Sequence, residues 1–72
     1  MHEIIRETAA KHNISTEHLL GHNRRRGVAW ARFEIMCRAR HEVGASYALI
    51  GKVLGGRDHT TIMHGIKRYE NR

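Results

Sequence analysis

The sequence contains no proline, a single cysteine and few aromatic residues: one tryptophan, one phenylalanine and two tyrosines among 72 positions. This composition, with 40% apolar residues, favours a small helical unit over a sheet of short strands separated by turns. Because Cys37 has no possible partner within the chain, an internal disulfide is excluded, and we expect a reducing compartment.

Other missing features exclude further classes of protein. The longest apolar run is far too short to span a bilayer, and residues 1–3 lack the layout of a signal peptide, so we expect a cytoplasmic protein without a membrane partner. A phosphate-binding loop of the form GxxxxGK[ST], a Ser/His/Asp set and a carboxylate pair are all missing. We therefore expect no enzymatic activity, no catalytic residue and no cofactor. His59 and His64 lie five positions apart and Cys37 is distant, so the spacing predicts no metal site.

Positive charge is what the sequence has in excess. Thirteen Lys and Arg residues oppose seven Asp and Glu residues, which gives a formal net charge of +6 with histidines neutral. Such a chain suits a polyanionic partner, either nucleic acid or an anionic membrane. With 72 residues the chain is one domain, residues 1–72, and its hydrophobic core must be small.

Hydrophobic spacing and capping residues predict a series of helices. The first covers residues 1–12, with Ile4, Ile5, Thr8 and Ala9 on one side. A short helix, capped by Ser15 or Thr16, carries Leu19 and Leu20 into the core and ends at Gly21. The third helix runs from 28 to 43, and the fourth from 47 to 54 behind a Ser46 cap. Between the second and third, the segment Gly21-His22-Asn23-Arg24-Arg25-Arg26-Gly27 reads as a basic loop.

The third predicted helix has a buried stripe formed by Val28, Ala31, Ile35, Met36, Ala39 and Val43. Arg32 falls within this stripe, where an unpaired guanidinium would be costly. It therefore needs a partner, which is either a buried carboxylate or carbonyl, or a phosphate of bound DNA. Trp30, Phe33 and Cys37 project from the other side of the helix and indicate either a protein contact or a surface covered by the first helix.

The most informative stretch begins at Gly55-Gly56. Two consecutive glycines break the preceding helix, and Asp58 is a good N-cap whose side chain can accept a hydrogen bond from the first turn of a new helix. On that helix Ile62, Ile66 and Tyr69 face the core. The opposite side carries Thr60, Thr61, His64, Lys67 and Arg68. Two helices joined by a glycine turn, the second with a polar face, predict a helix-turn-helix.

The run Gly55-Gly56-Arg57-Asp58-His59-Thr60-Thr61, followed by two apolar residues and His64, resembles the signature of the C-terminal DNA-binding domain, domain IV, of the bacterial replication initiator DnaA. The resemblance begins at Ile14 and continues through the Arg24-Arg25-Arg26 run, Ser46 and Ile50-Gly51. It implies an all-α, multi-helix domain containing a helix-turn-helix of the Trp-repressor and DnaA domain IV kind. Where that family has Arg-Pro, this chain has Trp30-Ala31.

The resemblance also implies roles for individual residues. It implies that Arg24 contacts bases in the minor groove and that Asp58, His59 and Thr60 contact bases in the major groove. From its chemistry, Asp58 can accept from a cytosine amino group and Thr60 can contact thymine. For His59 the helical wheel leaves open a second position, at the edge of the core. We expect contacts to the DNA backbone from Arg25, Arg26, Arg32, Arg40, Ser46, Tyr47, Arg57, Thr61, His64, Lys67 and Arg68.

The leading prediction is a stand-alone, monomeric, nucleoid-associated protein of phage or bacterial origin that binds double-stranded DNA at a site resembling the DnaA box. It would regulate replication initiation or transcription. The alternative is a protein-interaction module that binds DnaA or another replication protein through Trp30, Phe33 and Cys37.

Overall fold

The computed structural model describes residues 1–22 and 24–72; Asn23, within the predicted basic loop, lies outside the described residues. Every regular element in these two ranges is helical, as predicted. The elements are α1 (His2–His12), α2 (Thr16–Leu20), α3 (Arg26–Arg38), the π-helical segment η1 (Ala39–Val43), α4 (Tyr47–Val53) and α5 (His59–Glu70). Within the described ranges, no helix is both long enough and apolar enough to cross a membrane.

Two of the predicted N-caps, at Ser15 and Ser46, are present in the structure. The Ser15 hydroxyl accepts a hydrogen bond from the His18 backbone N–H at 3.2 Å, and the Ser46 hydroxyl accepts one from Leu49 at 3.1 Å. Helix α1 ends at Asn13, whose φ of 53° lies in the left-handed region. These local stops set the lengths of the helices that pack together.

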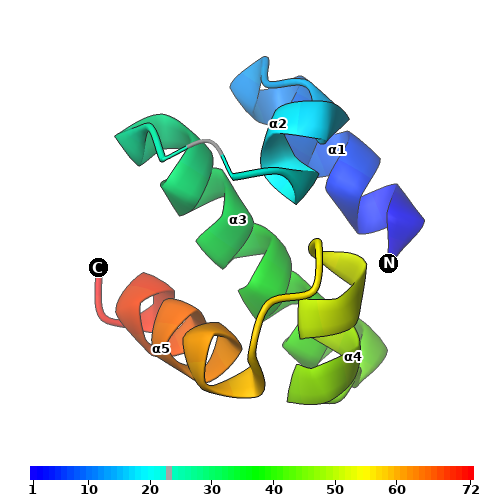
Figure 1. Ribbon diagram of the computed structural model, residues 1–72, viewed down its shortest axis with the longest axis vertical. Coiled ribbons are helices and arrows are strands. Elements are labelled where there is room, and N and C mark those ends of the chain that lie inside the picture. The colour runs from blue at the N-terminus through cyan, green and yellow to red at the C-terminus, as the bar shows by residue number, and fades with distance from the viewer. Residues whose placement is uncertain (23) are drawn as a thin grey trace.

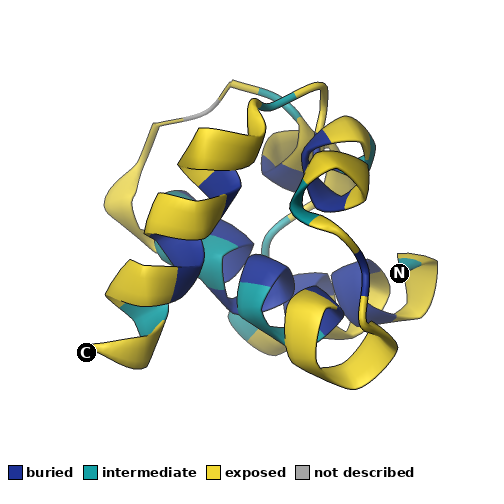
Figure 2. Cartoon of the chain, turned by 90° about the horizontal axis from the view of Figure 1, so that it is seen from below, coloured by how far each residue is buried: buried dark blue, intermediate teal, exposed yellow. Residues whose placement is uncertain are grey.

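Helix α3 is the central element, and the other helices pack around it (Figure 1). It contacts α5 on one side and α1 on another, while α4 packs against α5. The largest fully buried side chains come from all the helices: Thr8, Leu19, Ile35, Met36, Ile50, Leu54 and Ile62. Burying each large aliphatic side chain contributes about 1.5–3 kcal/mol. Figure 2 shows the buried residues on the inward sides of the helices and the exposed residues outside.

The third helix differs from its predicted form at both ends. It starts at Arg26 and not at Val28, because Arg25 takes the extended backbone conformation of an N-cap. From Ala39 it continues as a π-helix, whose wider turns shift side chains out of the α-helical register. Val43, predicted to be buried, is therefore 55% exposed. Leu20, also predicted in the core, is partly exposed at the end of the five-residue helix α2.

A buried carboxylate, which the sequence did not point to, links three helices. Glu34 of α3 is 4% exposed and lies 3.1 Å from Lys11 Nζ and 3.0 Å from His12 Nε2, both of α1. The Tyr69 hydroxyl of α5 donates to the same carboxylate at 3.3 Å. Burial acts to raise the pKa of Glu34, but hydrogen bonds from His12 and Lys11 outweigh it and hold the pKa below its usual value.

The Glu34 contacts predict a specific loss of stability in acid. Because the pKa of Glu34 is lower in the folded state than in the unfolded chain, its contribution is complete above the unfolded value of about 4.3 and declines as pH falls through the folded value. Urea unfolding followed by circular dichroism between pH 7 and pH 3 should show this decline. Glu34→Gln should reduce the pH dependence of the free energy of unfolding. Some dependence should remain, because the pKa values of Glu42 and Asp58 are also lowered.

The matched control is Glu17→Gln, which changes an exposed carboxylate of α2. It should retain the pH dependence of the unaltered chain. Equal pH dependence in the Glu34 and Glu17 variants would contradict the role of Glu34.

Candidate nucleic-acid interface

Helix α5 has one apolar and one polar side, as the sequence predicted. Ile62, Gly65 and Ile66 are buried. The polar residues predicted to face a partner are all exposed: Thr60, Thr61, His64, Lys67 and Arg68. In Figure 2, the helix that leads to the C-terminus is buried along its inner side and exposed along its outer side. The polar side of α5, which carries these residues, is therefore exposed to solvent along the length of the helix.

The first residues of α5 present a carboxylate, an imidazole and a hydroxyl. Asp58 is the N-cap of α5 with an extended backbone, as predicted, although its side chain forms no cap hydrogen bond of the kind seen at Ser15 and Ser46. Its carboxylate instead lies 3.2 Å from His59 Nδ1, and a hydrogen bond from the Thr60 side chain holds the pKa of Asp58 below its usual value. The carboxylate is thus ionised at neutral pH and accepts hydrogen bonds only. The His59 side chain is 62% exposed, so the core-edge position is wrong.

The turn between α4 and α5 is fixed to α4 by backbone hydrogen bonds. Gly55 and Gly56 have φ values of 84° and 81°, a left-handed conformation that suits glycine. The Gly51 carbonyl accepts hydrogen bonds from Gly56 N–H at 2.9 Å and from Arg57 N–H at 2.8 Å. These bonds set where α5 begins relative to α4, which is the geometry of a helix-turn-helix.

Arg57 has a structural role that differs from its predicted one. Its guanidinium donates to the carbonyl oxygens of Leu54 and Gly21, and burial lowers its pKa. Both terminal nitrogen atoms of the guanidinium, Nη1 and Nη2, are thus hydrogen-bonded within the protein. Arg57 joins the turn before α5 to the end of α2, and we no longer expect it to contact DNA.

Arg32 likewise takes backbone carbonyls as partners, one of the two alternatives that its position left open. It is 7% exposed, and its Nε donates to Leu19 O at 2.8 Å. Its Nη2 donates to His18 O at 2.7 Å and to Gly21 O at 3.0 Å. The expected phosphate contact from Arg32 is therefore wrong, because its guanidinium is buried and already paired. Arg32 and Arg57 together anchor Gly21, where the basic loop begins.

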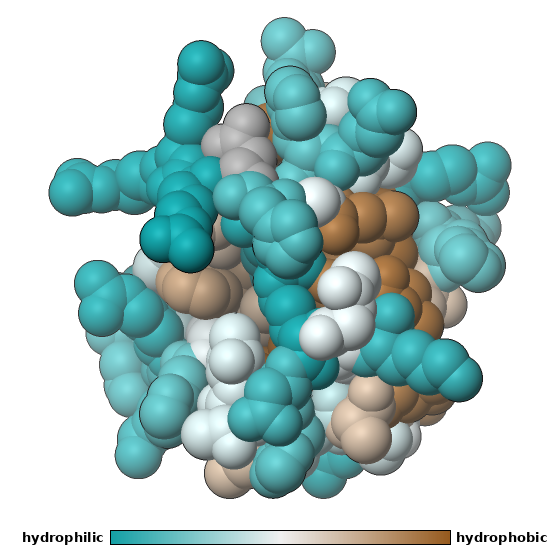
Figure 3. All heavy atoms as spheres, in the orientation of Figure 1, coloured by the Kyte–Doolittle hydropathy of each residue, from teal (hydrophilic) through white to brown (hydrophobic). Residues whose placement is uncertain are grey.

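The arginines of the basic loop, which follow Gly21 in the chain, are exposed to solvent. Arg24 precedes α3, Arg25 is its N-cap and Arg26 is its first residue. Figure 3 shows hydrophilic side chains extending outward at the upper left, in the region where Figure 1 places the start of α3. The loop thus presents its cationic side chains to solvent from a fixed starting point.

The aromatic side of α3 is covered by α5, which corrects the expectation of a free protein-binding face or a cover from α1. The Trp30 ring lies 5.9 Å from that of Phe33 and 5.4 Å from that of Tyr69. Gly65 makes this packing possible, because a Cβ at that position would lie 2.9 Å from the Phe33 ring and 2.5 Å from Met36 Sδ. Phe33 and Cys37 are partly buried against the core.

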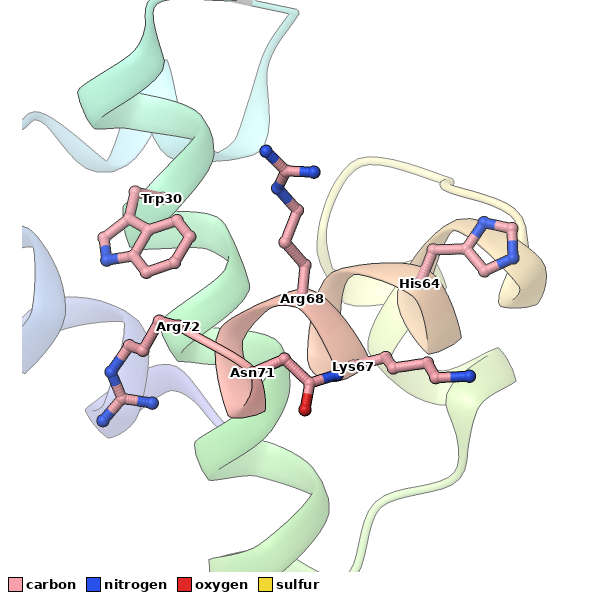
Figure 4. Close-up of a pocket in the computed structure, with 6 residues that line it drawn as sticks. All are labelled: Trp30, His64, Lys67, Arg68, Asn71 and Arg72. Carbon is pink, nitrogen blue, oxygen red and sulfur yellow. The ribbon is translucent and has the colours of Figure 1, made fainter.

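Two pockets around Trp30 connect α5 with the basic loop. The first, of about 560 Å³, is lined by Trp30, His64, Lys67, Arg68, Asn71 and Arg72. The second, of about 480 Å³, is lined by Arg26, Ala29, Trp30, Phe33 and Arg68. Arg68 and Trp30 belong to both, and Figure 4 shows the Arg68 side chain extending from α5 toward α3. Arg26 of the loop and Arg68 of α5 line the same pocket, and neither pocket is lined by a carboxylate. The two arginines therefore belong to one cationic surface.

Sequence reasoning missed Asn71 and Arg72 at this surface and gave Trp30 a different role. Helical spacing does not place Arg72 there, because α5 ends at Glu70 and the Arg72 guanidinium donates to Tyr69 O at 2.6 Å and lies 4.0 Å from the centre of the Tyr69 ring. No sequence signal places Trp30 beside Arg26 and Arg68, because the contact depends on how α5 packs on α3.

Three other predicted residues form a separate group at the start of α4. The Arg40 guanidinium donates to Ala45 O at 3.2 Å and lies 4.5 Å from the centre of the Tyr47 ring. The Ser46 hydroxyl is engaged in the helix cap. Arg40 and Ser46 are exposed, while Tyr47 is partly buried.

The fixed turn between α4 and α5 and the exposed polar side of α5 define a helix-turn-helix domain. A protein-family model described as "Bacterial dnaA protein helix-turn-helix" matches residues 1–68. The chain therefore belongs to this family, as its signature residues indicated.

Full-length relatives carry the same family name. The chain is 41% identical over 66 residues to the chromosomal replication initiator protein DnaA of Herpetosiphon aurantiacus, and the match covers 92% of this chain but 14% of that protein. For the DnaA of Thermomicrobium roseum the identity is 39% over 69 residues, covering 94% of this chain and 15% of the relative. The chain thus spans about one seventh of the length of these relatives. No solved structure matches it.

Proposed function

We propose that residues 1–72 act as one helix-turn-helix domain that binds double-stranded DNA at a site resembling the DnaA box. Helix α5 lies in the major groove, and Arg24 enters the adjacent minor groove. Family membership supports DNA binding, since the relatives are replication initiators by name. The observation that carries the proposal is the continuous cationic surface from Arg26 to Arg68 around the Trp30 pockets.

The start of α5 supplies the groups that distinguish bases. The ionised Asp58 carboxylate can accept a hydrogen bond from the amino group of cytosine, and Thr60 offers a hydroxyl together with a methyl group for thymine. His59, held beside Asp58, contacts a purine edge. Because a carboxylate is repelled by phosphate, Asp58 favours an orientation in which the helix start points at the bases and not at the backbone.

Cations around this helix start position the domain on the duplex. A guanidinium is attracted to the negative potential of a narrow, A·T-rich minor groove, which is the role proposed for Arg24. With Arg32 and Arg57 assigned to the protein interior, the proposed backbone contacts are Arg25, Arg26, Arg40, Ser46, Tyr47, Thr61, His64, Lys67 and Arg68. Phosphate contacts fix register and carry no sequence information themselves.

We further propose that the protein binds as a monomer, associates with the nucleoid and regulates replication initiation or transcription by occupying such sites. The alternative, a protein-interaction module, relied on the side of α3 that carries Trp30, Phe33 and Cys37. Helix α5 packs on this side, since a Cβ at Gly65 would lie 2.9 Å from the Phe33 ring and the Trp30 ring lies 5.4 Å from that of Tyr69. Less of the apolar face is therefore open to a protein partner, and DNA binding is the function that we propose.

The test compares a fluorescent duplex containing a DnaA box with a scrambled duplex of equal composition across a salt series. We expect tighter binding to the box. If five to seven phosphates are neutralised, the slope of log K against log salt should be about −5 to −6. Equal affinity for the two duplexes would contradict site recognition, and the lack of any binding at low salt would contradict DNA binding itself.

Substitutions separate the two kinds of contact. Thr60→Ala and Arg24→Ala should each cost about 1–3 kcal/mol on the box and much less on the scrambled duplex. Arg68→Ala should weaken binding to both duplexes alike and reduce the salt slope by about one. The matched control is Arg6→Ala, which removes an exposed cation from α1 and should leave selectivity unchanged.

A further inference from the structure

Three side chains with metal-binding atoms meet where the end of α5 lies beside η1. They are Cys37 of α3, His41 of η1 and Glu70 of α5, and one ligand atom from each lies within 4.8 Å of the other two. His41 Nε2 is 2.8 Å from Glu70 Oε2. Cys37 is partly buried, while His41 and Glu70 are exposed, so the group is open to ions in solution.

The spacing along the chain suits a metal ion. Cys37 of α3 and His41 of η1 are four residues apart, and their ligand atoms lie within 4.8 Å of each other even though the π-helical turn begins between them. The third residue, Glu70, comes from a different helix and approaches the same point. Thiolate, imidazole and carboxylate together are characteristic zinc ligands, and three protein ligands plus one water molecule form a common open zinc site.

The separations of the ligand atoms can be compared with those of a zinc site. Zinc lies about 2.0–2.3 Å from nitrogen, oxygen and sulfur ligands, so neighbouring ligand atoms in a tetrahedral site are about 3.3–3.8 Å apart. The three ligand atoms all lie within 4.8 Å of one another, and His41 Nε2 and Glu70 Oε2 are 2.8 Å apart, so the exposed His41 and Glu70 side chains would have to separate slightly to hold an ion.

We propose that Cys37, His41 and Glu70 bind one Zn²⁺ ion, with water as the fourth ligand, and thereby connect the last turn of α5 to η1. None of the three residues belongs to the proposed DNA contacts, so metal binding can be measured separately from DNA binding. The ion would hold the end of α5 in place next to the residues that line the Trp30 pocket, Lys67 and Arg68 among them.

Binding requires the Cys37 thiol to lose its proton to solvent as the Zn–S bond forms. Zinc affinity should therefore increase with pH from 6 to 8.

Cobalt(II) is the probe, because it occupies zinc sites and absorbs visible light. Titration of Co²⁺ into the reduced 72-residue chain should produce a thiolate-to-cobalt charge-transfer band that saturates at one ion per chain and is abolished by Zn²⁺. Cys37→Ser should remove the band. His41→Ala and Glu70→Gln should each weaken binding at least about tenfold, the loss that even outer partners of metal ligands produce.

The matched control is His18→Ala, which removes an exposed histidine from α2 and should bind cobalt as the unaltered chain does. If Cys37→Ser does not fold, a second measurement takes the place of that variant: the rate at which an alkylating reagent modifies Cys37 with and without Zn²⁺. Zinc should slow alkylation in the unaltered chain and should not slow it in His41→Ala. A missing charge-transfer band, or one that persists unchanged in both His41→Ala and Glu70→Gln, would overturn the proposal.

Discussion

Replacing Gly51 with alanine should destabilise the domain by about 3 kcal/mol or more and abolish DNA binding. A Cβ at this position would lie 2.0 Å from the Arg57 carbonyl oxygen, far inside van der Waals contact. The obstructing atom is backbone, so relief requires the turn before α5 to move. That movement also breaks the hydrogen bonds from Gly56 and Arg57 to the Gly51 carbonyl.

Urea unfolding and binding to the box duplex measure the two parts of this expectation. The matched control is Gly27→Ala, in the first turn of α3, where a Cβ would meet nothing within 4 Å. That substitution should be neutral or stabilise the protein by up to about 1 kcal/mol. Similar stabilities for the two variants would show that the turn is not held against α4 as described.

Arg32→Met should cost about 2–4 kcal/mol of stability. Methionine retains a long apolar side chain for packing but has no donor, so it isolates the hydrogen bonds. The carbonyls of Leu19, His18 and Gly21 would each lose a charged donor, and those near the buried guanidinium cannot all recover a water partner. Because Gly21 begins the basic loop, binding to the box should weaken as well.

Arg40→Met is the matched control for stability, since its exposed guanidinium donates to one carbonyl, that of Ala45. It should change the free energy of unfolding by less than about 1 kcal/mol. If Arg32→Met were no more destabilising than Arg40→Met, the buried hydrogen bonds would contribute little. If it unfolded the chain outright, Arg32→Lys should recover part of the stability by restoring a single donor.

The predictions that were confirmed depend on residues a few positions apart. Ser15 and Ser46 cap helices because a side-chain oxygen three positions away reaches the backbone N–H. The polar and apolar sides of α5 follow from helical periodicity, with Ile62 and Ile66 buried and His64 exposed. Each of these features can be recognised from one short stretch of sequence.

The π-helical turn that exposes Val43 is a local error, but the errors about the site concern residues whose partners are distant in the chain. Arg57 resembled a phosphate-binding arginine because it lies in a basic signature, but its guanidinium donates to Gly21 O, 36 positions away. The partner of Arg32 was left open for the same reason, because every residue has a backbone carbonyl and the sequence does not indicate which one a guanidinium will contact. Phe33 was expected either to be exposed to a protein partner or to pack against α1. It packs instead against α5, which approaches closely because Gly65 has no side chain.

The sequence alone predicted an all-α fold, the Ser15 and Ser46 caps, the glycine turn and the polar face of α5. These follow from capping, backbone conformation and periodicity, which act over one or two helical turns. Only the tertiary structure decided which arginines are internal, that Arg26 and Arg68 share one surface around Trp30, and that Glu70 meets Cys37 and His41. Those outcomes depend on how α5 and α2 pack against α3, and packing between helices depends on side-chain shapes that no single stretch of sequence contains.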